Sequence, residues 1–139
     1  MKFSETERRF MVLWVDDDEF FLQVARKCLL TEGGLDVEIA FSIFEAFKKM
    51  EKINPDAIIG SCLDAEENLF VFLKELRSKG IKTPFIALIA DNEKDLALKA
   101  RDLGANGVVT KFGEPAIIYP LLKKLIMSLV EPSGGISES

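Results

Sequence analysis

The sequence predicts an α/β domain built on a doubly wound parallel sheet. Short apolar runs, each the length of a buried strand, alternate five times with segments of helical periodicity along nearly the whole chain. The chain has 139 residues, the size of one ordinary domain, and 48% of them are hydrophobic. It is therefore long enough to bury a substantial core, and we expect a single domain.

Five runs of apolar or β-branched residues predict the strands. The runs are continuous and lack polar alternation, which is typical of parallel strands covered on both faces. The first run ends abruptly in the acidic residues 16–19. The predicted strands cover residues 10–15, 37–41, 57–59, 85–90 and 107–110.

The segments between these runs predict helices with recognisable boundaries. An apolar stripe ends at Gly33 and Gly34, and Ser42 with Glu45 three residues later forms a capping-box pattern. Pro120 is tolerable only in or near the first turn of the last helix, whose start we therefore expect to be irregular. The predicted helices lie within residues 18–33, 42–50, 70–80, 91–104 and 114–130.

Composition excludes several classes of function. The formal net charge of −5 and the pI near 4.9 disfavour contact with a phosphate backbone, so we expect no nucleic-acid partner. No apolar run approaches the ~18 residues of a membrane span, and residues 1–10 lack the apolar stretch of a signal peptide. We therefore expect a cytoplasmic protein without membrane contact. The absence of histidine excludes His-based catalysis and His-ligated metals, and Cys28 and Cys62 predict reduced, buried thiols.

The expected domain covers residues 10–130. Residues 1–9 form an N-terminal leader, and the small, polar residues 131–139 are typical of a flexible tail or a linker to a further module.

Polar side chains gather where the predicted strands end, which is the edge at which open parallel sheets bind ligands. Asp16 and Asp17 follow the first strand, and two adjacent carboxylates suit a hard cation such as Mg²⁺. The alternative is that Asp17 or Asp18 merely caps the following helix. Lys111 ends the fifth strand, where the fold would bring it opposite the carboxylate pair as an ion-pair partner or phosphate ligand.

Six segments together resemble, in order and spacing, the receiver domain of two-component response regulators. They are residues 15–18, 55–59, 72–77, 83–86, 103–107 and 111. The resemblance covers roughly residues 10–130. It implies a flavodoxin-like (βα)₅ fold with sheet order 2-1-3-4-5, and a signalling module in place of an enzyme.

The resemblance also implies a set of chemical roles. In that family an acidic pair holds Mg²⁺, and an aspartate ending the third strand takes a phosphoryl group from a histidine kinase. A hydroxyl residue ending the fourth strand and a lysine ending the fifth bind the phosphoryl oxygens. An aromatic residue on the fifth strand reports the switch.

Only part of this set carries over to the present chain. The matching residues are Asp16 and Asp17 for the acidic pair and Lys111 for the lysine. With the acceptor carboxylate missing, the resemblance implies a Mg²⁺ site that is weak at best, formed by the acidic pair and the carbonyl of Leu63.

Three other positions depart from the family pattern. The acceptor position is Ser61, the hydroxyl position of the fourth strand is Ile89, and the aromatic position is Val108. A serine hydroxyl is a poor nucleophile without a base, and the chain has no histidine to serve as one. We therefore expect a receiver that acts independently of phosphorylation.

Two alternatives remain open at this stage. A different register would make Asp64 the acceptor, so that the chain would be a working phosphoacceptor through Asp64 or Asp16. The other is a small-molecule binder of the flavodoxin type, which the lack of a phosphate-binding loop after the first strand disfavours.

The predicted fifth helix indicates a partner surface. It carries apolar residues on more than one side, and Leu98 lies away from the inward stripe of the fourth helix. The resemblance implies signalling partners, either a histidine kinase or an output or sensor module. It also implies a homodimer through the fourth helix, fifth strand and fifth helix. The alternative is that the fourth strand and the tail cover these side chains.

Overall fold

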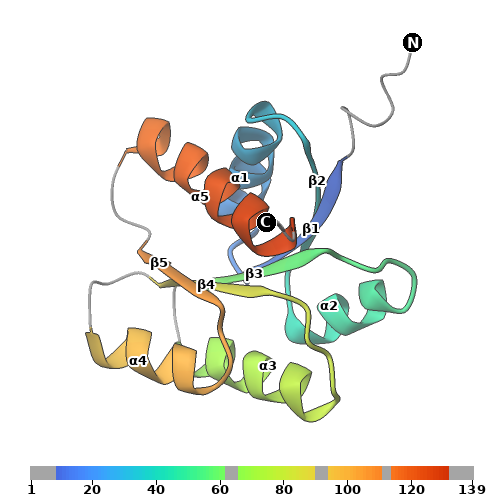
Figure 1. Ribbon diagram of the computed structural model, residues 1–139. Coiled ribbons are helices and arrows are strands. Elements are labelled where there is room, and N and C mark those ends of the chain that lie inside the picture. Colours follow the sequence, from blue (N-terminus) through green and yellow to red (C-terminus); the bar gives the residue numbers. More distant parts are fainter. Residues whose placement is uncertain (1–8, 62–65, 90–93, 111–113, 132–139) are drawn as a thin grey trace, which may run out of the picture.

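The computed structural model describes residues 9–61, 66–89, 94–110 and 114–131, in which strands and helices alternate along the chain (Figure 1). The strands are β1 (Phe10–Val15), β2 (Leu35–Ala40), β3 (Ala57–Ser61), β4 (Phe85–Ile89) and β5 (Gly107–Thr110). The helices are α1 (Glu19–Thr31), α2 (Ile43–Met50), α3 (Glu66–Ser78), α4 (Lys94–Asp102) and α5 (Pro115–Val130).

The strands form one parallel sheet in the order β2-β1-β3-β4-β5, which confirms the predicted fold class and topology. β1 lies inside the sheet, where Val12 pairs with Val37 of β2 and Ala57 of β3. Every strand therefore ends at the same edge of the sheet, which brings the residues after β1 and the last residue of β3 together.

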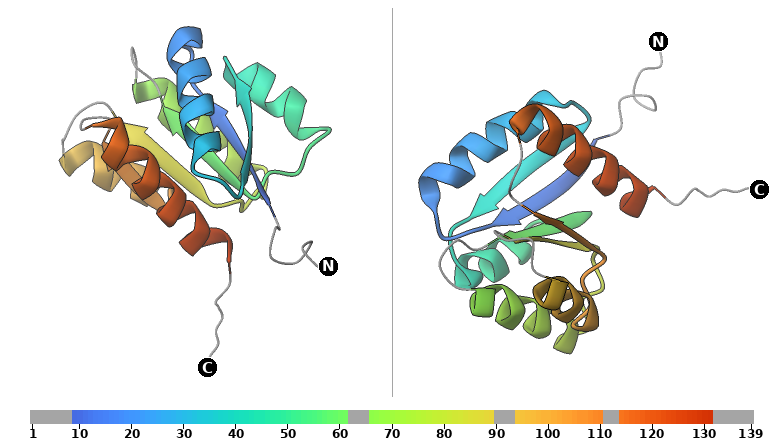
Figure 2. Two further views of the ribbon diagram at one scale, coloured as in Figure 1. Left: turned by 90° about the horizontal axis from the view of Figure 1, so that it is seen from above. Right: turned by 90° about the vertical axis from the view of Figure 1, so that its left-hand side faces the viewer.

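Helices cover both faces of the sheet (Figures 1 and 2). α1 and α5 pack on the face that carries the side chains of Val12, Trp14 and Ile59, and α2, α3 and α4 pack on the opposite face. Trp14 is fully buried under α1, where its ring meets Phe21 edge-on at 5.9 Å between centroids. Two separate cores thus hold the central strands rigidly between them.

Two strand boundaries differ by two residues from the sequence prediction, and β2 also ends one residue early, at Ala40. β2 begins at Leu35, two residues early, because Gly33 and Gly34 adopt positive φ and turn the chain directly into a buried pair with Phe10. β3 continues through Gly60 to Ser61, although glycine usually weakens a strand. A Cβ at Gly60 would lie 2.5 Å from the ring of Phe85, so the close packing of α3 and β4 requires glycine here.

The helix boundaries follow the predicted signals except at α3, which begins at Glu66, four residues before the predicted segment. Ser42 caps α2 by accepting from the N–H of Glu45, and the Glu45 carboxylate accepts from the N–H of Phe41 and not from that of the cap residue. α5 begins at Pro115, so Pro120 lies inside the helix and leaves its start regular, contrary to our expectation. The start predicted for the fourth helix, at Asp91, lies outside the described residues, and Cys28 is a half-buried free thiol. Among the residues described, no helix has the length and apolarity to cross a membrane.

Candidate functional site at the carboxyl edge of the sheet

The candidate site lies where β1 and β3 end side by side. Val15 of β1 pairs with Gly60 of β3, so Asp16 and Ser61 follow at adjacent positions. Asp16 is 2% exposed and Ser61 is 5% exposed, and they are the two polar side chains that the described residues bury. The structure thus brings together two of the residues that the sequence singled out.

A chain of three side chains joins these residues to the core. The indole Nε1–H of Trp14 donates to the Ser61 Oγ at 3.0 Å, and the Ser61 hydroxyl donates to Asp16 Oδ2 at 2.5 Å. The other carboxylate oxygen of Asp16 accepts from the N–H of Asp18 at 3.0 Å. Each polar atom of Ser61 and Asp16 therefore has a partner, as buried polar groups require.

Asp18 has a structural role. Its carboxylate accepts from the N–H of Phe21 at 3.0 Å and caps α1, which confirms the capping alternative for this residue. Asp17 is exposed and lines the cavity described next.

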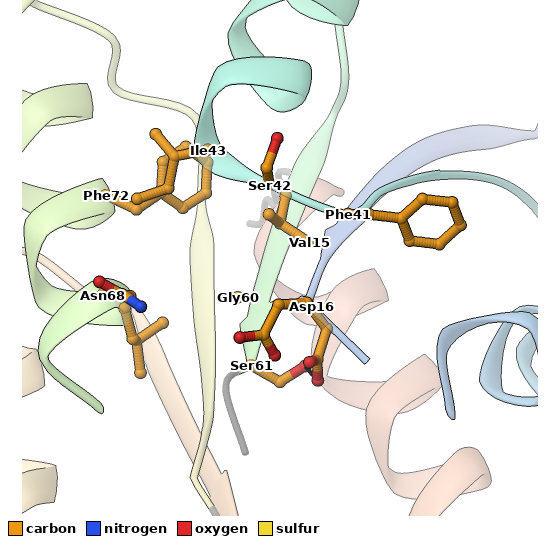
Figure 3. Close-up of a pocket in the computed structure, with 11 residues that line it drawn as sticks. Val15, Asp16, Phe41, Ser42, Ile43, Gly60, Ser61, Asn68 and Phe72 are labelled. Carbon is orange, nitrogen blue, oxygen red and sulfur yellow. Dashed lines mark hydrogen bonds between the residues drawn. The ribbon is translucent and has the colours of Figure 1, made fainter. Parts of the chain in front are cut away.

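A cavity of about 260 Å³ opens beside the buried pair (Figure 3). It lies between the ends of β1 and β3, the turn into α2 and the first turns of α3. Two carboxylates stand at one end and mostly apolar side chains form the walls. The lining residues are Val15, Asp16, Asp17, Phe41, Ser42, Ile43, Gly60, Ser61, Asn68, Leu69 and Phe72.

The described side chains fit a resident Mg²⁺ ion poorly. Hard cations bind several oxygen ligands, and carboxylates are the preferred ones, yet the cavity offers only the carboxylates of Asp16 and Asp17 among its described residues, and each oxygen of Asp16 already accepts a hydrogen bond. Among the described residues, no group of three or more acidic, cysteine or histidine side chains is placed to hold a metal ion. The hydroxyl of Ser61 adds no charge to the site.

The remaining predicted site residues lie elsewhere or outside the described residues. Ile89 ends β4 and is buried at 1% exposure on the face covered by α2, α3 and α4, and Val108 is half-buried against the same core. Lys111, Leu63 and Asp64 are outside the described residues, so their places in the site stay predictions.

Trp14 was not among the predicted site residues. Its place in an apolar strand predicted a core residue, although the indole N–H reaches the site from within the core. Position 14 lies two residues before Asp16 and so on the same side of the strand. It is the chain's single tryptophan. A buried tryptophan needs an acceptor for its N–H, and that requirement was the available clue.

Comparison with known proteins places this geometry in a family. The family model described as "Response regulator receiver domain" matches residues 12–122. The chain belongs to this family, as the resemblance implied. Receiver domains are signalling modules of two-component systems, and they interact with histidine kinases and output domains.

Curated relatives are longer than this chain. Transcriptional regulatory protein CiaR of Streptococcus pneumoniae is 33% identical over 104 residues, which are 75% of this chain and 45% of the relative. A protein-glutamate methylesterase/protein-glutamine glutaminase of Treponema denticola is 31% identical over 103 residues, or 72% of this chain and 28% of the relative. The chain thus spans less than half the length of these relatives.

Solved receiver structures share the whole fold. The receiver domain of a Francisella response regulator is 25% identical, with a TM-score of 0.73, over 86% of this chain and 98% of that one. Chemotaxis protein CheY4 of Vibrio cholerae is 27% identical, with a TM-score of 0.72, over 84% and 98% of the two chains. The sheet order and the helix arrangement described above are those of the family.

Proposed function

We propose that this receiver domain acts without phosphorylation, as a protein-interaction module in two-component signalling. The observation that carries the proposal is the state of Ser61, the residue at the position that we assign to the phosphoacceptor. Ser61 is 5% exposed, and its hydroxyl is held between the Trp14 N–H and the Asp16 carboxylate. That arrangement suits a closed structural site.

Ser61 lacks the chemistry of an acceptor. A nucleophilic serine needs a base that removes its proton, and the group that accepts the hydrogen bond of Ser61 is a carboxylate, which is a weaker base than the histidine that usually activates a serine. Asp16 is an equally poor acceptor, because it is 2% exposed and both of its oxygens accept hydrogen bonds. We expect Mg²⁺ to bind weakly at best, because the carboxylate of Asp16 is buried and already accepts hydrogen bonds.

The parts that would transmit a phosphorylation signal are also absent from their proposed positions. Ile89 has no hydroxyl to follow a phosphoryl group, and Val108 has no ring to move inward. Both are aliphatic side chains packed against the core under α2, α3 and α4. Loss of the acceptor and of both switch residues supports a domain that stays in one state.

Binding then depends on a permanently displayed surface. α4, β5 and α5 adjoin at one end of the sheet (Figure 1), and three apolar side chains of the two helices are exposed. Leu98 is 59% exposed, Ile117 63% and Leu121 46%. Apolar side chains so exposed favour a protein interface, and we propose that this face forms a homodimer or receives a signalling partner.

The phosphorylation test uses acetyl phosphate with Mg²⁺ and intact mass as the measurement. We expect no phosphoryl mass on the natural protein. Ser61→Asp restores a carboxylate between Trp14 and Asp16 and should become labelled slowly, because Ile89 offers no hydroxyl to the phosphoryl oxygens. A change of conformation should follow only when Ile89→Thr and Val108→Tyr are added.

Ser128→Asp is the matched control, since Ser128 is exposed on α5 and its hydroxyl bonds only to the Leu125 carbonyl. It should remain unlabelled. Label on Asp16 or Asp64 of the natural protein would overturn the proposal and favour a phosphoacceptor that uses an atypical aspartate.

The surface test measures molar mass by light scattering over a range of concentrations. Leu98→Asp should abolish any dimer, whereas Val71→Asp, at a side chain 50% exposed on α3, should leave it intact. Equal effects of the two substitutions would exclude the α4-β5-α5 face as the interface.

A further inference from the structure

We infer that Trp14 is a positioning residue that keeps residue 61 closed to metal ions. The inference deepens the proposed function and rests on it, because it concerns the same site. Trp14 lies near the carboxyl end of β1 with its ring fully buried under α1, and it reaches the site through its indole N–H.

The direction of the hydrogen bonds follows from the chemistry of the three groups. An indole nitrogen is a donor only, so the Ser61 oxygen must accept from it. The Ser61 hydroxyl carries one hydrogen. The Asp16 carboxylate, 2.5 Å away, has no hydrogen to donate in its ionised form and so accepts from that hydroxyl. Trp14 thus leaves Ser61 one arrangement, in which its proton is directed at Asp16.

The ring that imposes this arrangement is itself fixed. Trp14 has no exposed surface, and Phe21 meets its ring edge-on at an interplanar angle of 80°. Asp18 in turn holds the backbone of Phe21 at the first turn of α1. The donor is therefore presented to position 61 by a packed core and keeps its place when the residue there changes.

This donor has a consequence for any carboxylate placed at position 61. The indole N–H would hydrogen-bond to one of its oxygens and withdraw negative charge from it. The carboxylate would keep lone pairs for a metal ion, but with less negative charge to attract it. Trp14 and Ser61 thus act together. Replacing Ser61 alone leaves the indole N–H of Trp14 directed at position 61.

The test compares Mg²⁺ binding by calorimetry in three variants. Ser61→Asp alone should bind Mg²⁺ weakly. Trp14→Phe with Ser61→Asp keeps an aromatic ring but lacks the N–H. It should bind about tenfold more tightly, the factor expected when one hydrogen bond to a charged group is removed. Ile59→Val with Ser61→Asp is the control, because it loosens the same core cluster and keeps the indole; it should bind like Ser61→Asp alone.

A spectroscopic measurement on the serine-containing protein tests the contact itself. The chain has one tryptophan, so its indole N–H gives one resonance in an isotope-labelled sample. We expect slow hydrogen exchange at this N–H in the natural protein and faster exchange in Ser61→Ala. Unchanged exchange in Ser61→Ala would mean that Ser61 is not the acceptor, and the inference would fail.

The inference and the proposed function can fail separately. If the Trp14→Phe, Ser61→Asp protein binds Mg²⁺ no more tightly than Ser61→Asp, including the case in which neither binds, Trp14 does not close the site. The natural protein would still be an unphosphorylated receiver. If the natural protein takes up a phosphoryl group, the proposed function fails whatever the metal titrations show.

Discussion

At the amino edge of the sheet, Arg77 of α3 joins the turns that precede β4 and β5. Its guanidinium donates to the carbonyls of Ile81 at 2.8 Å, Thr83 at 3.0 Å and Gly104 at 2.7 Å, and to the Asn106 side chain at 3.1 Å. At the carboxyl edge the buried polar groups are the side chains of Trp14, Ser61 and Asp16, which bond mainly to one another. The Arg77 cluster holds backbone turns in place. The hydrogen bonds among Trp14, Ser61 and Asp16 engage the polar atoms of the candidate site.

Three of the six segments that resemble the receiver family meet at the amino edge. Arg77 belongs to the segment 72–77, and its partners come from the segments 83–86 and 103–107. The departures, at positions 61, 89 and 108, lie at the ends of strands or on β5. The comparison teaches that the three segments joined by Arg77 make the fold recognisable because they build it, and that these segments carry no information about the chemistry.

Replacement of Arg77 by Met should have the largest effect on stability. Methionine keeps the aliphatic stem but leaves three backbone carbonyls without their donor, and we expect a loss of about 3 kcal/mol in the free energy of unfolding. Burial lowers the pKa of Arg77. Urea unfolding measures the change, with Arg101→Met, an exposed arginine of α4, as the control. Equal losses in the two variants would show that the amino-edge cluster is dispensable.

Ser61→Ala should have an intermediate effect. It leaves the buried N–H of Trp14 without its acceptor and Asp16 without one donor, which we expect to cost about 2 kcal/mol. The exposed Ser128→Ala serves as the control and should change stability little. A neutral or stabilising effect of Ser61→Ala would contradict this prediction, because it would mean that the hydrogen bonds of the carboxyl-edge cluster do not stabilise the fold.

The sequence alone was sufficient for the fold class, the strand order and most element boundaries. Continuous apolar runs, a capping serine and paired glycines act locally, so their effects can be predicted from neighbouring residues. The end of β3 was missed, because Gly60 is required by Phe85 and Leu69, which are close in space but distant in sequence.

The candidate site, too, was predicted from the sequence only in part. Asp16 and Ser61 were predicted as neighbours because the topology of a parallel sheet fixes which strand ends meet. The role of Trp14 was not predicted, since its donor crosses from β1 to the last residue of β3, 47 positions away. Such a contact depends on side-chain packing, which no local pattern in the sequence encodes.

Ser42→Ala should have the smallest effect on stability. It tests whether Ser42 only caps α2 or also belongs to the candidate site at the carboxyl edge. Ser42 lines the cavity beside Asp16, yet its hydroxyl accepts from the Glu45 N–H at 3.0 Å and caps α2. Loss of this cap should cost about 1 kcal/mol in the free energy of unfolding. Ser42→Asp, which can still accept from the same N–H, should restore most of it. The Mg²⁺ affinity of a Ser61→Asp background should stay unchanged by Ser42→Ala, because the Ser42 hydroxyl serves the helix. If calorimetry showed weaker Mg²⁺ binding when Ser42→Ala is added, the chemical site would extend to the start of α2, and the carboxyl-edge cluster would be larger than Trp14, Ser61 and Asp16.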